Sequence, residues 1–381
     1  MNAFTYRKTI TASIGSFFRH QWAKALLYFL VLLGFGFFYY QPLQKQRLSP
    51  HADGGLIQYA IVRNIQNVTR LDFEGWNDRR IYYPNKNTLA FTDHYYLHSL
   101  IGFPYYLLTR DPMNTYNFIF VVQLLIAISG YYALARKVSN NTTAIIITAI
   151  YFVYLPAFLR KHPQINFYGF IPWIAFFVFQ FVQKKEVKYL YWTALALLFQ
   201  SLVGIYHQLF TFMVAPIFLA MVIFHLHKTS RLKEYLSMRI IVHFTLAIVM
   251  LGAVLFLVNF PYLEFKRTVG IVWPLELLRG GSSDAASYFD VDASVFIADL
   301  LGRKPLPVQA NNFLGVTGTV ALIASLVAVL LRLVFRVGTN RNLNIVYLCV
   351  SCFIVVWLFS LGPHLKIMGH DTGIRLPYYY L

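Results

Sequence analysis

Apolar runs about as long as a bilayer is thick recur along this chain, and they constrain its fold more than any other feature. A bilayer core about 30 Å thick needs roughly 20 apolar residues per α-helix. We predict about nine such spans, at Trp22–Tyr40, Tyr116–Ala135, Ala144–Leu159, Ile165–Val182, Tyr189–Tyr206, Leu209–Leu226, Ile240–Phe260, Phe313–Phe335 and Leu343–Gly362. The predicted fold class is therefore an all-α polytopic integral membrane protein.

The composition supports a lipid environment and argues against a nucleic-acid partner. The chain is 58% hydrophobic and 13% charged, which is too apolar for a soluble domain of 381 residues. Its formal net charge of +18 comes from Lys and Arg in short clusters between the apolar runs. Such clusters report membrane topology, so the expected partner is the bilayer.

The short connections between spans predict the topology. Those that contain Arg136, Lys184, Lys233 and Arg336 are basic, so we place them and the N-terminus in the cytoplasm. The N-terminal segment has no small-residue cleavage site, and we interpret it as a retained anchor. The chain is then a single multi-pass domain, residues 1–381, of the cytoplasmic membrane.

Two long loops, residues 42–110 and 261–311, then face the exterior. At the end of the first loop, Tyr95–Thr109 is apolar and aromatic but short for a span and interrupted by Pro104. We predict an interfacial helix there. The chain ends in the aromatic sequence GHDTGIRLPYYYL without a polar tail, so we expect a C-terminal truncation.

Two carboxylates of the first external loop are candidate catalytic groups. Asp53 lies in HADGG, where Gly54 and Gly55 let the backbone approach a ligand, and it suits a base at the membrane surface. The alternative is a loop Asp in an Asx turn before a helix. Asp93 lies beside His94 in NTLAFTDHYYLH. The alternative there is that Thr92 or Asp93 caps the helix that follows.

Cationic and aromatic groups near the same membrane face are candidate substrate ligands. Arg and Lys neutralise a departing phosphate, which transfer from a phosphate-activated donor requires. The candidates are Arg79, Arg80, Arg160, Lys161, His162, Tyr206 and His207. Alternatively, residues 160–162 form a snorkelling helix end and His207 is a hydrogen-bonded interfacial histidine.

Several segments, taken together, resemble a known family. They are the D-G pair after the first span, IYYPNKNTLAFTDHYYLHSLIGFPYYLLTRDPMNTYN, LRKHPQINFYGFIPW, ASYF before NNFLGVTG, and SLGPHLKIMGHDTGIRLPYYYL. This set is similar to bacterial polytopic membrane glycosyltransferases of the C-type (GT-C) superfamily. The resemblance extends over nearly the whole chain.

The resemblance implies a polyprenyl-phosphate-linked sugar donor, transfer at the external face and a catalytic Asp in the first external loop. Asp53 matches the catalytic position and Asp93 the second acidic motif. Many relatives have another acidic residue where this chain has His94. The resemblance therefore leaves open whether Asp53, Asp93 and His94 hold a divalent metal (Mg or Mn). Arg375, in the last similar segment, joins the candidate substrate ligands.

The expected function is sugar transfer to a glycan, lipid or protein acceptor in cell-envelope synthesis. A transporter or flippase of lipid-linked sugars, and a non-catalytic membrane protein with the same fold, are the alternatives. Transporters place charged coupling groups near mid-membrane, whereas these spans carry almost no charge at mid-depth. The pattern therefore favours chemistry at the membrane surface.

Overall fold

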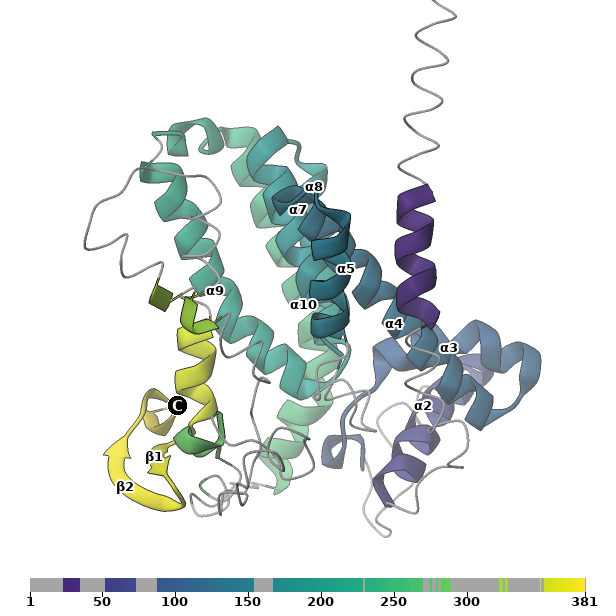
Figure 1. Ribbon diagram of the computed structural model, residues 1–381. Helices are drawn as coiled ribbons and strands as arrows, with labels where there is room; N and C mark the ends of the chain where they lie inside the picture. The colour runs from purple at the N-terminus through teal and green to yellow at the C-terminus, as the bar shows by residue number, and fades with distance from the viewer. Residues whose placement is uncertain are drawn as a thin grey trace, which may run out of the picture. The chain divides into compact units, whose positions relative to one another are not determined.

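Long apolar helices dominate the structure. The computed structural model describes residues 23–34, 52–72, 88–153, 167–228, 230–269, 282–288 and 353–380, with positions 275, 279, 322–324, 326–327 and 350. Within these residues, three helices are long and apolar enough to cross a bilayer: α4 (Pro112–Val138), α9 (Ile205–Lys228) and α10 (Met238–Val269) (Figure 1). The prediction of a helical membrane protein is confirmed, and the number of nine spans stays a prediction.

Shorter elements connect these helices. They are the helix Ala23–Gly34, α2 (Ala52–Arg70), η2 (Thr88–Phe91), α3 (Tyr96–Thr109), α5 (Thr142–Val153), α7 (Phe170–Lys184), α8 (Lys188–Ser201), η4 (Leu232–Tyr235), η5 (Ala285–Tyr288), β1 (His364–Ile367), β2 (His370–Arg375) and η6 (Pro377–Tyr380). The chain divides into two compact units, residues 1–211 with 235–265, and residues 212–234 with 266–381. The single domain over residues 1–381 stays a prediction.

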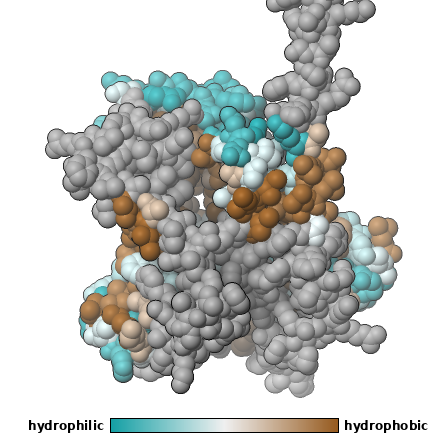
Figure 2. Space-filling view, in the orientation of Figure 1, coloured by the Kyte–Doolittle hydropathy of each residue, from teal (hydrophilic) through white to brown (hydrophobic). Residues whose placement is uncertain are grey.

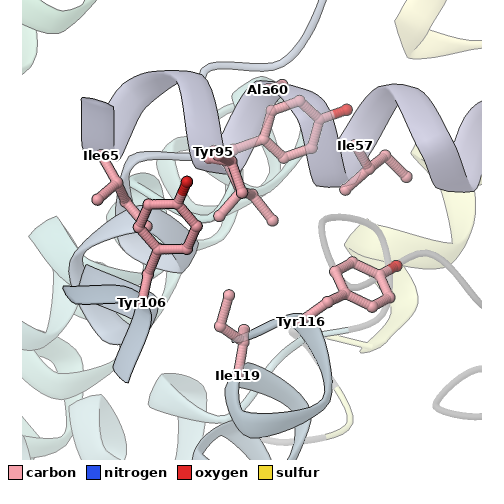
Figure 3. Packing of buried hydrophobic residues seen from close by; sticks show 9 residues of the cluster. Ile57, Ala60, Ile65, Tyr95, Tyr106, Tyr116 and Ile119 are labelled. Atoms are coloured by element: carbon pink, nitrogen blue, oxygen red, sulfur yellow. The ribbon is translucent and has the colours of Figure 1, made fainter. Parts of the chain in front are cut away.

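The predicted first external loop contains an amphipathic helix, α2. Its apolar positions Ile57, Ile61 and Ile65 recur every four residues, which places them on one helix face. That face packs against Tyr95, Tyr106 of α3, and Tyr116 and Ile119 of α4, as Figure 3 shows. Burying these side chains stabilises the α2–α3–α4 contact by about 1.5–3 kcal/mol for each large residue.

The start of α2 corrects the interpretation of HADGG as a loop. Asp53 is the second residue of α2, and both glycines lie in its first turn. A carboxylate there suits the positive end of the helix dipole. The interfacial helix at Tyr95–Thr109 is confirmed as helical to within one residue: α3 has 14 residues, which is too short to cross a bilayer.

Two other predicted spans have different bounds from those expected. The span Tyr189–Tyr206 is interrupted, because α8 ends at Ser201 and α9 begins at Ile205. α10 continues through Pro261 to Val269, into the predicted second loop. Apolar composition did not show the first boundary, since residues 202–205 are apolar or glycine, and α10 continues through a segment that contains Glu264, Lys266 and Arg267.

The basic connections after α7 and after α9 meet at one end of the first unit. Tyr235 of η4 donates its hydroxyl proton to the Val182 carbonyl of α7, and the Lys185 ammonium lies 5.7 Å from the centre of the Tyr235 ring. The opposite ends of α9 and α10 approach residues 92–93. The predicted topology and its cytoplasmic side stay predictions.

A glycine allows α4 and α7 to pack closely. A Cβ atom added at Gly130 would lie 2.6 Å from Cδ1 of Trp173, closer than real Cβ atoms approach other atoms. The Trp173 ring covers this glycine, and its indole N–H donates to the Ile126 carbonyl at 3.2 Å. The close approach of the two helices and the indole hydrogen bond therefore require a residue without a side chain at position 130.

We expect Gly130→Ala to lower stability by about 1–3 kcal/mol, because the added methyl group displaces the Trp173 ring. The matched control is Gly252→Ala in α10, where no atom lies within 4 Å of the added Cβ. The control should change stability by less than about 0.5 kcal/mol. Thermal unfolding in detergent measures both, and equal melting temperatures for the two variants would contradict the role of Gly130.

The second unit contains the described strands, which the sequence did not predict. β1 and β2 form an antiparallel hairpin in which Lys366 pairs with Asp371. A lone hairpin is marginally stable in water. Here the Asp284 carboxylate supports its turn by accepting the backbone N–H groups of Met368 at 3.1 Å and Gly369 at 2.7 Å.

Candidate functional site

Asp93 joins two segments that are 112 residues apart in the sequence. Its Oδ1 accepts the backbone N–H of Ile205, the first residue of α9, at 3.0 Å. We predicted that Thr92 or Asp93 caps the helix that follows, α3. This prediction is wrong, because Asp93 caps α9. Tyr95, in the left-handed conformation and with no side-chain cap hydrogen bond, precedes α3. Asp93 instead satisfies an N–H group that the break before α9 leaves open.

Backbone and tyrosine hydrogen bonds hold the Asp93 segment in place. The Leu97 N–H donates to the Leu202 carbonyl at 2.9 Å, on the opposite side of the same break. The Tyr262 hydroxyl of α10 donates to the Thr92 carbonyl at 2.9 Å. We call this meeting point the Asp93 junction, formed by residues 92–99 and 200–207 with Asn64, Phe167, Tyr168 and Tyr262.

Asn64 connects α2 to the junction. Its amide donates to the His94 carbonyl at 2.8 Å and to the Ser99 hydroxyl at 2.9 Å, and all three residues are buried. Ser99 in turn donates to the Tyr95 carbonyl. Buried amides are retained where their hydrogen bonds are made, so α2 has a fixed register against residues 94–99.

Gln200 satisfies two further open backbone groups. Its Nε2 donates to the Phe167 carbonyl at 2.8 Å, and its Oε1 accepts the N–H of Phe170, the first residue of α7, at 3.2 Å. The same Nε2 lies 3.0 Å from Nδ1 of His207. The His207 ring meets Tyr168 edge to face at 4.6 Å. A single fully buried amide therefore links the end of α8 to the starts of α7 and α9.

The Asp93 carboxyl lies in an unusual electrostatic environment. Burial raises its pKa above the ordinary value, and the N–H of Ile205 offsets part of this rise. Oδ1 is engaged by Ile205, while Oδ2 makes no hydrogen bond with the described residues. A half-buried carboxyl with one free oxygen and a raised pKa can hold or exchange a proton.

Three buried histidines belong to the Asp93 junction: His94, His98 and His207. His94 stacks on Tyr96 with the ring centres 5.0 Å apart. No three His, Cys, Asp or Glu side chains in the described part of the chain are placed to hold a metal. Because the Asp53 side chain lies outside the described residues, the divalent metal stays a prediction.

The other predicted site residues are distributed differently. Both His207 and Tyr206 lie in the junction, but His207 is 2% exposed, whereas Tyr206 is 59% exposed. Arg375 belongs to the second unit, where its guanidinium lies over the Tyr379 ring at 4.5 Å. Five predicted cations lie outside the described residues: Arg79, Arg80, Arg160, Lys161 and His162.

Sequence reasoning missed three residues that build the junction: Asn64, Gln200 and Tyr262. Gln200 interrupts the apolar run TALALLFQSL, and a polar side chain in such a run is expected to have an internal partner. Asn64 occupies the apolar face of α2, which gives a similar signal. Tyr262 gave none, because tyrosines are frequent throughout this chain.

We expect Asp93→Ala to destabilise the first unit by about 1–2 kcal/mol, because it leaves the Ile205 N–H open. Asp93→Asn should retain most of that stability, since its side-chain oxygen can still accept the N–H. Thermal unfolding of both variants in detergent separates the two effects. If Asp93→Asn were as unstable as Asp93→Ala, the side-chain oxygen that accepts the Ile205 N–H would not be the source of the stability.

The raised pKa of Asp93 predicts a specific pH dependence. A raised pKa means that the folded state favours the protonated form of Asp93. The stability that this form contributes is fully present below the ordinary pKa of 3.8, and it is lost as the pH rises through the folded-state pKa. Asp93→Asn cannot ionise, so its melting temperature should rise relative to that of the wild type between about pH 4 and pH 8. A difference that stays constant across this range would contradict the raised pKa.

Comparison with known proteins gives one match. A family model described as a domain of unknown function, DUF6311, matches residues 23–379. No curated protein and no solved structure matches the chain. The match includes every residue of the Asp93 junction.

Proposed function

This chain belongs to the DUF6311 family, and because that description carries no activity, we propose a function from its residues: a membrane glycosyltransferase. It moves a sugar from a polyprenyl-phosphate-linked donor to an acceptor hydroxyl at the external face of the membrane. The product belongs to a cell-envelope glycan or glycoprotein. The observation that carries this proposal is the half-buried Asp93 carboxyl at the start of a candidate span, whose Oδ2 makes no hydrogen bond with the described residues.

The position of Asp93 fits a lipid-linked donor. Ile205 begins α9, so the carboxyl lies where an apolar helix of membrane length starts. A donor with a polyprenyl tail also places its phosphate and sugar at that depth, because the tail remains in the hydrocarbon. Groups that are fixed in a water-poor site stabilise developing charge more strongly than groups in water.

Asp53 is the proposed base that accepts the proton of the acceptor hydroxyl. It precedes Asn64 by eleven residues on α2, or roughly 16 Å along the helix axis. Asn64 fixes α2 to the junction, so the register of α2 also sets the position of Asp53 along this membrane face. Asp53 and Asp93 then have separate roles, with Asp93 on the donor side and Asp53 on the acceptor side.

Cations complete the proposed donor site. The lipid phosphate leaves with its negative charge, and Arg or Lys side chains stabilise that charge by charge-assisted hydrogen bonds. Arg160 and Lys161, with Arg79 or Arg80, are assigned this role from the sequence. The metal is not needed for the proton transfer to Asp53, so the proposal holds with or without it.

A transporter of lipid-linked sugars would use charged groups inside the membrane. In the described candidate spans, the Asp, Glu, Lys and Arg residues lie within the end turns, as Arg136 and Lys137 do in α4. In the Asp93 junction, Asp93 and Gln200 also bind backbone groups at helix starts. This distribution supports surface chemistry rather than alternating access.

We expect Asp53→Asn to abolish transfer while leaving membrane insertion and the melting temperature unchanged. The purified chain in nanodiscs is supplied with a panel of polyprenyl-phosphate sugars, and release of polyprenyl phosphate is measured. The matched control is Asp72→Asn, a carboxylate near the other end of α2 that pairs with Arg63 at 3.3 Å. This control should retain transfer.

Three outcomes are distinguishable. An active Asp53→Asn variant would exclude Asp53 as the base. Transbilayer movement of labelled donor without release of polyprenyl phosphate would identify a transporter. Neither release nor movement with any donor of the panel, by a correctly folded wild-type chain, would support the non-catalytic alternative.

A further inference from the structure

The β1–β2 hairpin of the second unit exposes three apolar side chains, and the exposed His370 is the cross-strand partner of one of them, Ile367. Ile367, Met368 and Ile374 are 45%, 56% and 55% exposed, respectively. Ile367 follows Lys366, and Ile374 precedes Arg375. Because side chains alternate along a strand, the two isoleucines lie on the face opposite these two cations. Figure 2 shows hydrophobic and hydrophilic residues side by side on the part of the surface where Figure 1 draws this hairpin.

The opposite face of the hairpin is cationic. Cross-strand partners point to the same side, so the pairs Lys366–Asp371 and His364–Arg375 share one face. Arg375 and Lys366 make no ion pair with a described carboxylate. Lys366 donates to the Arg279 carbonyl, and Arg375 lies over the Tyr379 ring.

The one carboxylate on this face is internally compensated. Asp371 accepts the Gly373 N–H at 2.8 Å, and its Oδ2 lies 3.4 Å from Nδ1 of His364 and 4.0 Å from Nε of Arg279. The Gly373 N–H, with His364 and Arg279 nearby, holds the pKa of Asp371 below its ordinary value. The two cations therefore dominate the charge that the face presents.

The hairpin follows an apolar segment almost directly. Residues 353–360 are helical and end the uncharged run LNIVYLCVSCFIVVWLFSLG, and β1 begins at His364. Three residues separate the helix from β1, and they can span at most about 10 Å. If this apolar run lies in the membrane, the hairpin must lie at the membrane boundary.

Tyrosines stand next to the hairpin. Tyr379 stacks on His364 with the ring centres 5.4 Å apart, and Tyr380 beside it is 73% exposed. Tyrosine is enriched at the depth of the lipid headgroups, where its ring contacts acyl chains and its hydroxyl contacts water. Exposed aliphatic side chains, tyrosines and cations beside an apolar segment are the combination that membrane-interface segments have.

We infer that the β1–β2 hairpin is a membrane-interface anchor, in which Ile367, Met368 and Ile374 enter the headgroup region and Lys366 and Arg375 contact anionic lipid phosphates. Each apolar side chain leaves water on insertion, and each cation gains attraction to the negative surface of the leaflet. This anchor is independent of the proposed sugar transfer.

The test places a nitroxide label on the hairpin of the full chain in nanodiscs. Ile367→Cys and Ile374→Cys are labelled separately, in a background with Cys349→Ser and Cys352→Ser, so that misfolding of one variant leaves the other informative. The aqueous control is Asn140→Cys, at an exposed position between α4 and α5. Collision rates with dissolved oxygen, which enters lipid, and with a water-soluble nickel chelate report the surroundings of each label.

We expect both hairpin labels to collide more with oxygen than with nickel, and the control label to show the reverse. Adding about 30% anionic lipid should shift the hairpin labels further from nickel, because basic residues near the surface are attracted to the negative leaflet. Lys366→Gln with Arg375→Gln should remove that shift. These two variants keep the apolar face intact.

Two results would overturn the inference. Hairpin labels as accessible to nickel as the Asn140 label would show a hairpin in water. Labels shielded from both reagents would show a protein contact, with a second copy or another chain. A depth that does not respond to anionic lipid would refute the role of Lys366 and Arg375.

Discussion

The rest of the first unit depends on how the open ends of broken helices are satisfied. Hydrocarbon offers no partner to a free N–H or carbonyl group, so a helix break at membrane depth is stable only when other segments supply the bonds. Here the break between α8 and α9 is satisfied by the Asp93 carboxylate at Ile205 and the Leu97 N–H at Leu202. Because these partners are more than a hundred residues away, the break also determines which distant segments come together.

This structural role has a chemical consequence. A side chain that must reach a buried N–H is itself partly removed from water, and burial raises the pKa of Asp93. The carboxyl that completes a helix end therefore becomes a candidate for proton exchange. Capping and catalysis are compatible at Asp93, since one oxygen holds Ile205 while the other remains available to a ligand.

The two units arrange their polar and apolar side chains differently. The first unit buries its polar groups among α2, α3 and the ends of α7 to α10, where hydrogen bonds fix their positions. The second unit exposes apolar side chains on a short hairpin whose turn is supported by Asp284. A buried network suits a site that must position reacting groups, whereas an exposed amphipathic hairpin suits attachment to lipid.

The sequence by itself determined the membrane class, the helix at Tyr95–Thr109 and Asp93 as a residue of interest, because hydropathy, length and rare carboxylates are local signals. Only the tertiary structure decided the break before Ile205, the helix that Asp93 caps, and the joining of Asn64, Gln200 and Tyr262. The hairpin at residues 364–375 also came from the structure. The physical reason is that these features are made by hydrogen bonds between distant segments, which no periodicity along the chain records.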